Sequence, residues 1–157
     1  MPGLEYLVRP ARITDIDRLA AIGGTSLSVS RRGQLDAADL LRQLVYLPNA
    51  SLLVVESHHR ELAGGGLLVL RPSVVSGGYV GTIDLLVVDE SGDPDRVTDI
   101  LMGELLRSAS NKGCSTVEVA VPTSNASLAR RERAGFGPAG ATLRRPVAVA
   151  GSVARRI

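Results

Sequence analysis

The order of helix-like and strand-like segments constrains the fold of this chain most strongly. Hydrophobic residues recur at helical spacing in four segments, near residues 14–22, 37–46, 94–111 and 125–134. Strand-like segments surround these helices, near residues 4–9, 51–56, 62–70, 79–88, 116–121, 139–143 and 146–149. We find no repeat or linker, and 157 residues suit one domain with a substantial core. The sequence therefore predicts a single mixed α/β (α+β) domain over residues 1–157.

Several helix boundaries are marked by capping residues. Asp93 is a predicted N-cap, and Pro94 suits the first helical turn because its backbone has no N–H to satisfy. Thr14 is the expected N-cap of the first helix. Ser124 and Asn125 most simply cap the last helix. We expect these residues to fix where the helices begin.

A hairpin turn and a glycine run stand out among the strands. Residues 58–61, which include His58 and His59, separate two strand patterns and indicate a turn. Adjacent histidines on an extended chain point to opposite sides, so we expect no metal site there. The run Gly64-Gly65-Gly66 indicates a bulge or a close approach of another backbone.

Composition bears on the cellular compartment. Cys114 is the only cysteine, which excludes an internal disulfide, and we expect it to be a small buried residue beside a strand. No apolar run reaches the roughly 18 residues of a membrane span, and no signal peptide is recognisable. We therefore expect a cytoplasmic protein that does not enter a membrane.

Charge is distributed unevenly along the chain. Residues 84–104 are mainly acidic, whereas residues 123–157 are mainly basic. A basic end can attract nucleic acid or anionic cofactors. No aromatic residues are interleaved there to stack on bases, so we do not expect a nucleic-acid partner. We expect Arg130, Arg131 and Arg133 to solvate an exposed helix face, with phosphate pairing as the alternative.

The local motifs resemble one family over nearly the whole chain. They comprise Val8-Arg9-Pro10-Ala11 through Asp15, Leu86-Val87-Val88 before an acidic turn and a helix, Gly113-Cys114, Ser124-Asn125, and Ala134-Gly135-Phe136. Together with the element order, they resemble the GNAT acetyltransferases. The resemblance implies a central mixed, mostly antiparallel sheet, splayed between strands 4 and 5 and flanked by four helices.

The resemblance also implies a reaction. Acetyl-CoA or another acyl-CoA lies where the two strands part, and its pantetheine pairs with the strand before the cofactor helix. An amine of a small molecule or peptide attacks the thioester, a base removes its proton, and an acid protonates the thiolate. Residues 25–32 correspond to the loop where relatives often bind the acceptor. The cofactor-binding residues implied here are Leu86, Val87, Val88, Arg96, Val97, Thr98, Asn125 and Arg130.

The cofactor loop departs from the family pattern. Relatives carry R/Q-x-x-G-x-G/A, whose glycines let backbone N–H groups surround a pyrophosphate. The matching segment here is Asp93-Pro94-Asp95-Arg96-Val97-Thr98, without glycine. Asp93 would accept the N–H groups that a phosphate needs, and the carboxylates nearby would repel a diphosphate.

The catalytic positions differ as well. Thr82 replaces the strand glutamate of several relatives, and Asp84, two residues on and expected on the same strand face, is the candidate base. If Asp84 lies on a buried strand, it must be paired, hydrogen-bonded or beside a cleft. Arg131 replaces the tyrosine acid; it stays protonated, so it can stabilise charge but donates a proton poorly.

Three functional hypotheses follow. The first is a divergent acyl-CoA-dependent N-acyltransferase whose catalytic residues are Asp84 and Arg131. The second is a catalytically degenerate GNAT-fold protein that acts as a binding or regulatory module. The third is a binder of nucleic acid or an acidic partner through the arginine-rich end. Edge strands near the C-terminus need cover, so a homodimer is left open.

Overall fold

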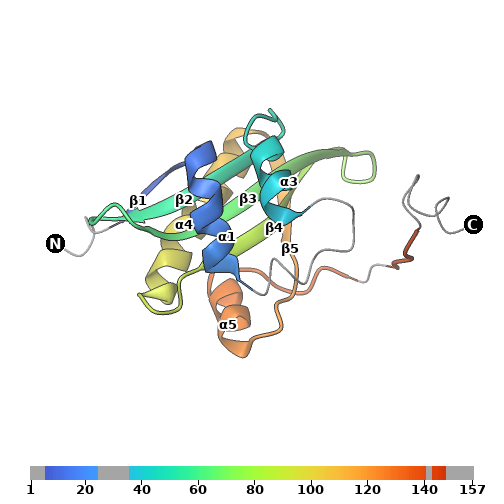
Figure 1. Cartoon of the computed structure of the whole chain (residues 1–157). Coiled ribbons are helices and arrows are strands. Elements are labelled where there is room, and N and C mark those ends of the chain that lie inside the picture. The colour runs from blue at the N-terminus through green and yellow to red at the C-terminus, as the bar shows by residue number, and fades with distance from the viewer. Residues whose placement is uncertain (1–5, 25–35, 141–142, 148–157) are drawn as a thin grey trace, which may run out of the picture.

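The computed structural model describes residues 6–24, 36–140 and 143–147. A five-stranded sheet has the order β1-β2-β3-β4-β5 (Figure 1). The first four strands are antiparallel, and β5 runs parallel to β4. The strands are β1 (Tyr6–Pro10), β2 (Ala50–Ser57), β3 (Leu62–Ser73), β4 (Gly78–Val88) and β5 (Cys114–Val119). This mixed, mostly antiparallel sheet confirms the predicted fold class.

In the described residues four α-helices flank the sheet, on both of its faces (Figure 1). Helices α1 (Ile16–Gly23) and α3 (Ala37–Leu44) cover one face, and α4 (Pro94–Asn111) covers the other. Helix α5 (Asn125–Arg133) lies beside the end of β5. A 3-10 turn, η2 (Ile13–Asp15), precedes α1.

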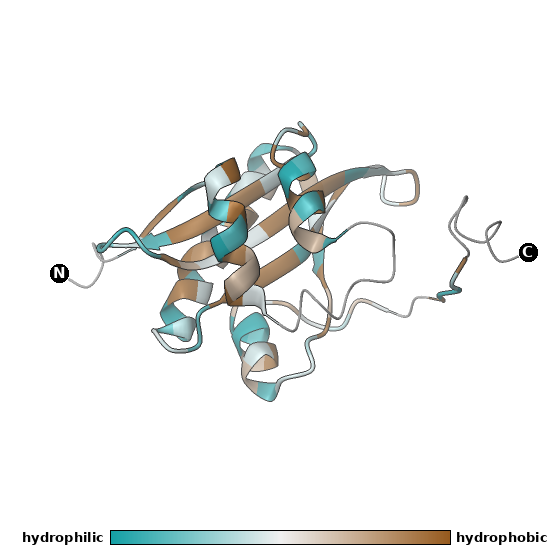
Figure 2. Ribbon diagram, in the orientation of Figure 1, coloured by the Kyte–Doolittle hydropathy of each residue, from teal (hydrophilic) through white to brown (hydrophobic). Residues whose placement is uncertain are grey.

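The sheet separates two hydrophobic cores. One centres on Leu19 of α1 and Leu67 of β3, and the other on Leu101 and Leu105 of α4 and Leu68 of β3. Figure 2 shows the hydrophobic residues concentrated along the strands that separate these layers. Because consecutive strand residues point to opposite faces, β3 contributes to both cores in turn.

The three glycines of β3 let helices approach the sheet closely. A Cβ atom on Gly65 would lie 2.6 Å from Leu19 Cδ1, and one on Gly66 would lie 2.7 Å from Leu105 Cδ1. At Gly64 the obstacle is the backbone itself, because a Cβ there would lie 2.7 Å from the Val87 carbonyl oxygen. The prediction of a close backbone approach is confirmed.

Strand β4 contains a bulge at Asp84. Ile83 pairs with Leu68 and Leu85 with Leu67, so Asp84 has no opposite residue on β3. An inserted residue bends a strand and changes the phase of its side chains. Simple alternation therefore does not fix the face of Asp84, which is exposed. The face that it was expected to share with Thr82 stays a prediction.

Some predicted boundaries also differ. No strand forms at residues 139–140 or 143–147, which leaves the outer edge of β5 unpaired within the described residues; 141–142 and 148–149 lie outside them. Thr14 is not an N-cap, because η2 forms first and Arg12 precedes it. The caps at Asp93 and Ser124 are confirmed, since each side chain accepts a backbone N–H of its helix.

Two predictions concern side-chain chemistry. His58 and His59 lie in the β2–β3 turn as predicted, and the described residues hold no group of three or more His, Cys, Asp or Glu side chains placed to bind a metal ion. Cys114 begins β5 and is partly buried against the α4 core.

Across the described part of the chain, the helices are too short or too polar to cross a bilayer.

An ion-pair network anchors the start of α1. Arg9 of β1 donates to Asp15 at 2.8 and 3.1 Å and to Glu56 of β2 at 3.0 Å. The Asp15 carboxylate also accepts the backbone N–H of Arg12 at 2.7 Å. The hydrogen bonds from Arg9 hold the pKa of the Asp15 carboxyl below its usual range. Since Asp15 is buried, this network fixes η2 against the sheet edge.

The Asp15→Asn variant is expected to lose about 1 to 2 kcal/mol of unfolding free energy at neutral pH. The Asp15 pKa is lower in the folded state, so its contribution is present above the unfolded pKa of about 3.9 and is lost as pH falls through the folded pKa. Urea unfolding from pH 7 to pH 2 should show the two proteins converging in acid. Asp17→Asn, at an exposed ion pair with Arg42, should change little; equal losses in both variants would contradict the assignment.

Candidate functional site

The strands β4 and β5 part at Asp84. Their pairing runs from Tyr79 with Cys114 to Ile83 with Val119 and then stops. Beyond this point β4 continues to Val88 and pairs only with β3. The backbone groups on the other edge of residues 84–88 have no strand partner in the part of the chain that the structure describes, so an extended ligand can pair with them. The splay that the resemblance predicts between strands 4 and 5 is therefore present.

A small cavity of about 20 Å³ lies beside the free half of β4. This volume suits roughly one water molecule. Side chains from three elements enclose the cavity: Leu86, Val88, Thr98, Ser127, Arg130 and Arg131. A ligand arm can enter here only if the side chains of α5 move.

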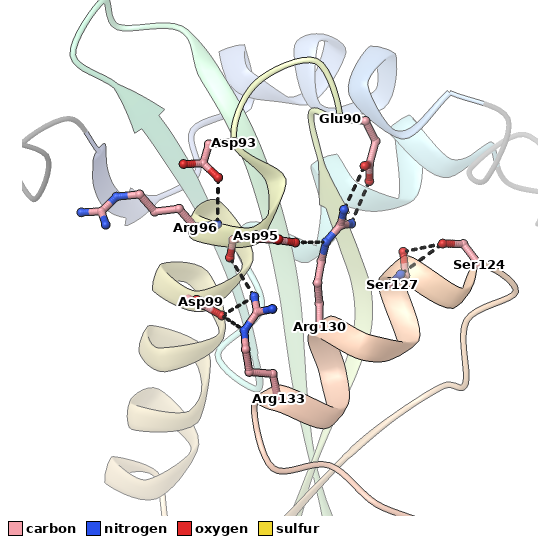
Figure 3. Close-up of polar contacts among 9 residues, drawn as sticks. All are labelled: Glu90, Asp93, Asp95, Arg96, Asp99, Ser124, Ser127, Arg130 and Arg133. Carbon is pink, nitrogen blue, oxygen red and sulfur yellow. Dashed lines mark hydrogen bonds and ion pairs between the residues drawn. The ribbon is translucent and has the colours of Figure 1, made fainter.

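Arg130 of α5 crosses from its helix to the start of α4 (Figure 3). Its Nε donates to Asp95 at 2.8 Å, and its two terminal nitrogens donate to the Glu90 carboxylate at 2.9 and 3.1 Å. The side chain is 8% exposed. The hydrogen bonds that Arg130 donates, first to Glu90 and then to Asp95, raise the pKa of its guanidinium, and the bond from Arg130 lowers the pKa of the Asp95 carboxyl. We call Arg130, Glu90 and Asp95 the Arg130 cluster.

Arg131 lies at the fork between the two strands. It lines the cavity with Leu86 and Val88 of β4, and it donates to the backbone oxygen of Ala120, just after the end of β5. Its Nε is buried without a hydrogen-bond partner among the described residues. Burial lowers the pKa of the Arg131 guanidinium. The fork thus contains a positive charge with unused hydrogen-bonding capacity.

The start of α4 provides few free amides. The Asp93 carboxylate accepts the N–H of Arg96 at 3.3 Å (Figure 3), and Pro94 has no N–H to offer. Pro94 and Arg96 both belong to the first turn, whose amides a helix N-terminus would otherwise offer to an anion. The side chain of Asp93 thus takes the place that a phosphate oxygen would need.

The structure brings together only part of the predicted site. Leu86, Val88, Thr98, Arg130 and Arg131 line the cavity beside β4. Val87 instead packs in the core under α1, and Val97 is buried in the α4 core. Asp84 lies at the fork but does not line the cavity, and neither do Arg96 and Asn125.

The prediction of an exposed face is wrong for Arg130 and Arg131 and is confirmed for Arg133, which is exposed. Arg130 is buried in its ion pairs, and Arg131 is partly buried in the fork. Arg133 donates to Asp99 of α4 at 2.9 and 3.2 Å. The acidic stretch and the basic stretch of the sequence therefore neutralise each other across α4 and α5.

Other predicted features lie away from the cavity. Glu118 faces solvent, where its carboxylate lies 3.7 Å from the guanidinium of Arg71 of β3. The sequence left open whether Glu118 faces a cleft or solvent, and the structure shows solvent. Ser124 caps α5 by accepting the N–H of Ser127 at 3.1 Å. Residues 25–32, the predicted acceptor loop, lie outside the described residues. An open depression of about 330 Å³ lies on the other side of β5, against the end of α4 and Phe136.

The fold and the parted strands define the class of this protein. Superposition on solved structures matches an aminoglycoside acetyltransferase from an uncultured soil metagenomic sample, with TM-score 0.74, 13% identity, and 95% of this chain and 99% of that chain covered. A glucosamine-6-phosphate N-acetyltransferase from Arabidopsis thaliana matches with TM-score 0.67 and 16% identity over 90% and 97%. A transcriptional regulator from Bacillus halodurans C-125 matches with TM-score 0.75 and 15% identity over 90% and 99%.

The chain has the fold of the GNAT acetyltransferases. No family model and no curated protein sequence matches it.

Proposed function

We propose that this protein is an acyl-CoA-dependent N-acyltransferase that acts on an amine of a small molecule or peptide. The observation that carries the proposal is the parting of β4 and β5 at Asp84. It leaves backbone donors and acceptors of β4 free beside two arginines, an arrangement suited to a ligand with an amide-containing arm and an anionic end. Solved structures with this fold include an aminoglycoside and a glucosamine-6-phosphate acetyltransferase.

The residues present fit acyl-CoA in one part and not in another. The free edge of β4 suits the pantetheine amides, with Leu86 and Val88 against its carbon chain. The α4 N-terminus does not suit a diphosphate, because Asp93 already accepts the amide of Arg96 and Pro94 has no amide N–H. Arg130 is the group that could pair with the diphosphate by its side chain. This protein would therefore bind phosphate through a guanidinium rather than through loop amides.

The transfer step needs a base and charge stabilisation. The amine nitrogen attacks the thioester carbonyl carbon, a C–N bond forms, and the C–S bond breaks with its electron pair leaving on sulfur. Asp84, exposed at the fork, accepts the proton that the nitrogen loses, directly or through water. Arg131 stabilises the negative charge that passes from the carbonyl oxygen to sulfur, and solvent protonates the thiolate.

A second candidate function is a binding or regulatory module without catalysis. The capping of α4 by Asp93 favours it, because a helix N-terminus that satisfies itself has less to offer a diphosphate. In that case the fold is kept and the acyl-CoA site is not used. The two candidates differ in whether the chain consumes thioester. We place either form in the cytoplasm, without a membrane or nucleic-acid partner.

The decisive experiment measures binding and turnover together. Calorimetry with acetyl-CoA and longer acyl-CoAs should show binding at submillimolar concentration, and a thiol-release assay with a panel of amines should show CoA formation. Asp84→Asn is expected to lower the turnover number about tenfold, because water can partly replace an exposed base. Glu104→Gln, at an exposed ion pair on α4, should leave turnover unchanged. Binding without thiol release for any amine would favour the second candidate.

A further inference from the structure

The attachment of α5 to the rest of the molecule depends on ion pairs. Of the nine residues of α5, Arg130 alone is buried. The helix has few apolar residues to pack, and Figure 2 shows it mostly hydrophilic. Arg130 holds Glu90 and Asp95, and Arg133 holds Asp99 (Figure 3). A helix held in this way can be released by another anion, because ion pairs can exchange partners without loss of apolar burial.

Arg130 itself forms part of the wall of the cavity beside β4. Arg130 and Ser127 of α5 face Leu86 and Val88 across a space of about 20 Å³. Glu90 lies two residues after the end of β4 and Asp95 lies in the first turn of α4, so Arg130 ties α5 to the end of β4 and to the start of α4 (Figure 3). The Arg130 guanidinium donates to both oxygens of the Glu90 carboxylate and to one oxygen of the Asp95 carboxylate.

Two carboxylates resemble a diphosphate in charge and in offering several acceptor oxygens to one guanidinium. Glu90 accepts from both terminal nitrogens of Arg130, in the paired geometry that a phosphate oxygen pair also adopts. Both acidic side chains are more than half exposed, so either can turn into solvent when displaced. Arg130 is buried and cannot leave without losing its partners. The exchange would therefore keep the arginine paired in both states.

We propose that the Arg130 cluster is an internal competitor for a diphosphate group: Glu90 and Asp95 occupy Arg130 in the free protein, and a diphosphate-bearing ligand displaces them while α5 moves away from β4. This inference deepens the proposed function and rests on it for the identity of the natural ligand as an acyl-CoA. It predicts that the free protein binds diphosphate more weakly than its arginine alone would allow.

The experiment compares matched single-charge variants. Glu90→Gln removes the paired carboxylate, and Glu104→Gln makes the same charge change at an exposed α4 pair, about 13 Å along the helix from Asp95. Dissociation constants for inorganic pyrophosphate and for CoA are measured by calorimetry without magnesium, at matched ionic strength. We expect Glu90→Gln to bind both about tenfold more tightly than the wild type, and Glu104→Gln to bind as the wild type does.

A second variant checks that the gain passes through the arginine. Arg130→Gln combined with Glu90→Gln should lose the gain for pyrophosphate, with folding verified by circular dichroism. In Glu90→Gln, the ¹⁵N signal of Arg130 Nε should shift on addition of pyrophosphate. Equal affinities for Glu90→Gln and Glu104→Gln, or a gain that survives loss of Arg130, would overturn the proposal.

The outcome separates this inference from the proposed function. A tenfold gain for pyrophosphate without thioester consumption by any variant would support the Arg130 cluster as competitor and count against acyl transfer. Thioester consumption by the wild type without a gain in Glu90→Gln would overturn the competitor alone. No pyrophosphate binding by Glu90→Gln at millimolar concentration would overturn it as well.

Discussion

Replacing Gly64 with alanine is expected to lower the free energy of unfolding by about 2 to 3 kcal/mol. The added Cβ would lie 2.7 Å from the Val87 carbonyl oxygen, 3.1 Å from Val97 Cγ1 and 3.3 Å from Val88 Cα. Two of these atoms belong to the β4 backbone, which is fixed by its pairing with β3. The clash is therefore relieved only by moving two strands apart, and this exceeds the roughly 0.5 to 1 kcal/mol that alanine gains through chain entropy.

Gly103 provides the matched control within the same chain. It lies in α4, is exposed, and a Cβ there would have no neighbour within 4 Å. Gly103→Ala should therefore raise the free energy of unfolding by about 0.5 to 1 kcal/mol. Urea unfolding of both variants, followed by circular dichroism, makes the comparison. If Gly64→Ala proved as stable as the wild type, the close approach of β3 and β4 at this point would be wrong.

Replacing Arg131 with leucine is expected to separate stability from activity. The rate constant kcat/KM for acyl transfer should fall about a hundredfold, because the fork loses the charge that stabilises the oxyanion and the thiolate. The free energy of unfolding should change by less than about 1 kcal/mol, since Arg131 is partly buried with an unpartnered Nε and leucine replaces its stem. Thiol-release kinetics and urea unfolding measure the two effects.

The control for Arg131 removes an arginine elsewhere. Arg107→Leu breaks an exposed pair with Glu104 and should leave kcat/KM unchanged. Unchanged kinetics in Arg131→Leu would show that Arg131 only supports the end of β5 through Ala120. A large loss of stability, with activity lost in proportion, would lead to the same conclusion.

The sequence predicted the fold well where one local signal was strong. The 18-residue helix α4 begins at Pro94 and ends at Asn111 as its capping and spacing indicate. The β2–β3 turn and the cap at Ser124 were equally readable. Strand signals after Phe136 were weak, and no strand forms in the described part of that region. Local propensity is sufficient where caps and periodicity agree, and insufficient for short apolar runs at the end of a chain.

The candidate site was predicted less well because it depends on long-range pairs. The Arg130 side chain reaches Glu90 and Asp95, which precede it by 40 and 35 residues. Helical spacing alone predicted that Arg130 is exposed to solvent, and none of the residues next to it in the sequence indicated that it is buried. The opposite charges of the two stretches were visible in the sequence, but their contact required the packing of α5 against α4. Charge asymmetry along a chain is thus a signal for internal pairing as well as for external partners.

The bulge at Asp84 reverses which residues of β4 face α4, the odd-numbered or the even-numbered ones. Before it, odd-numbered residues such as Ile83 face the α4 layer; after it, even-numbered residues such as Leu86 do. A polar replacement that is tolerated at an even position in the first half will therefore disturb the α4 core in the second half. Deleting Asp84 alone would bring Ile83 and Leu85 together in regular pairing with Leu68 and Leu67, and would leave Leu86 and Val88 on the α4 side. The extra residue therefore sets the course of β4 at the fork and not which side chains line it.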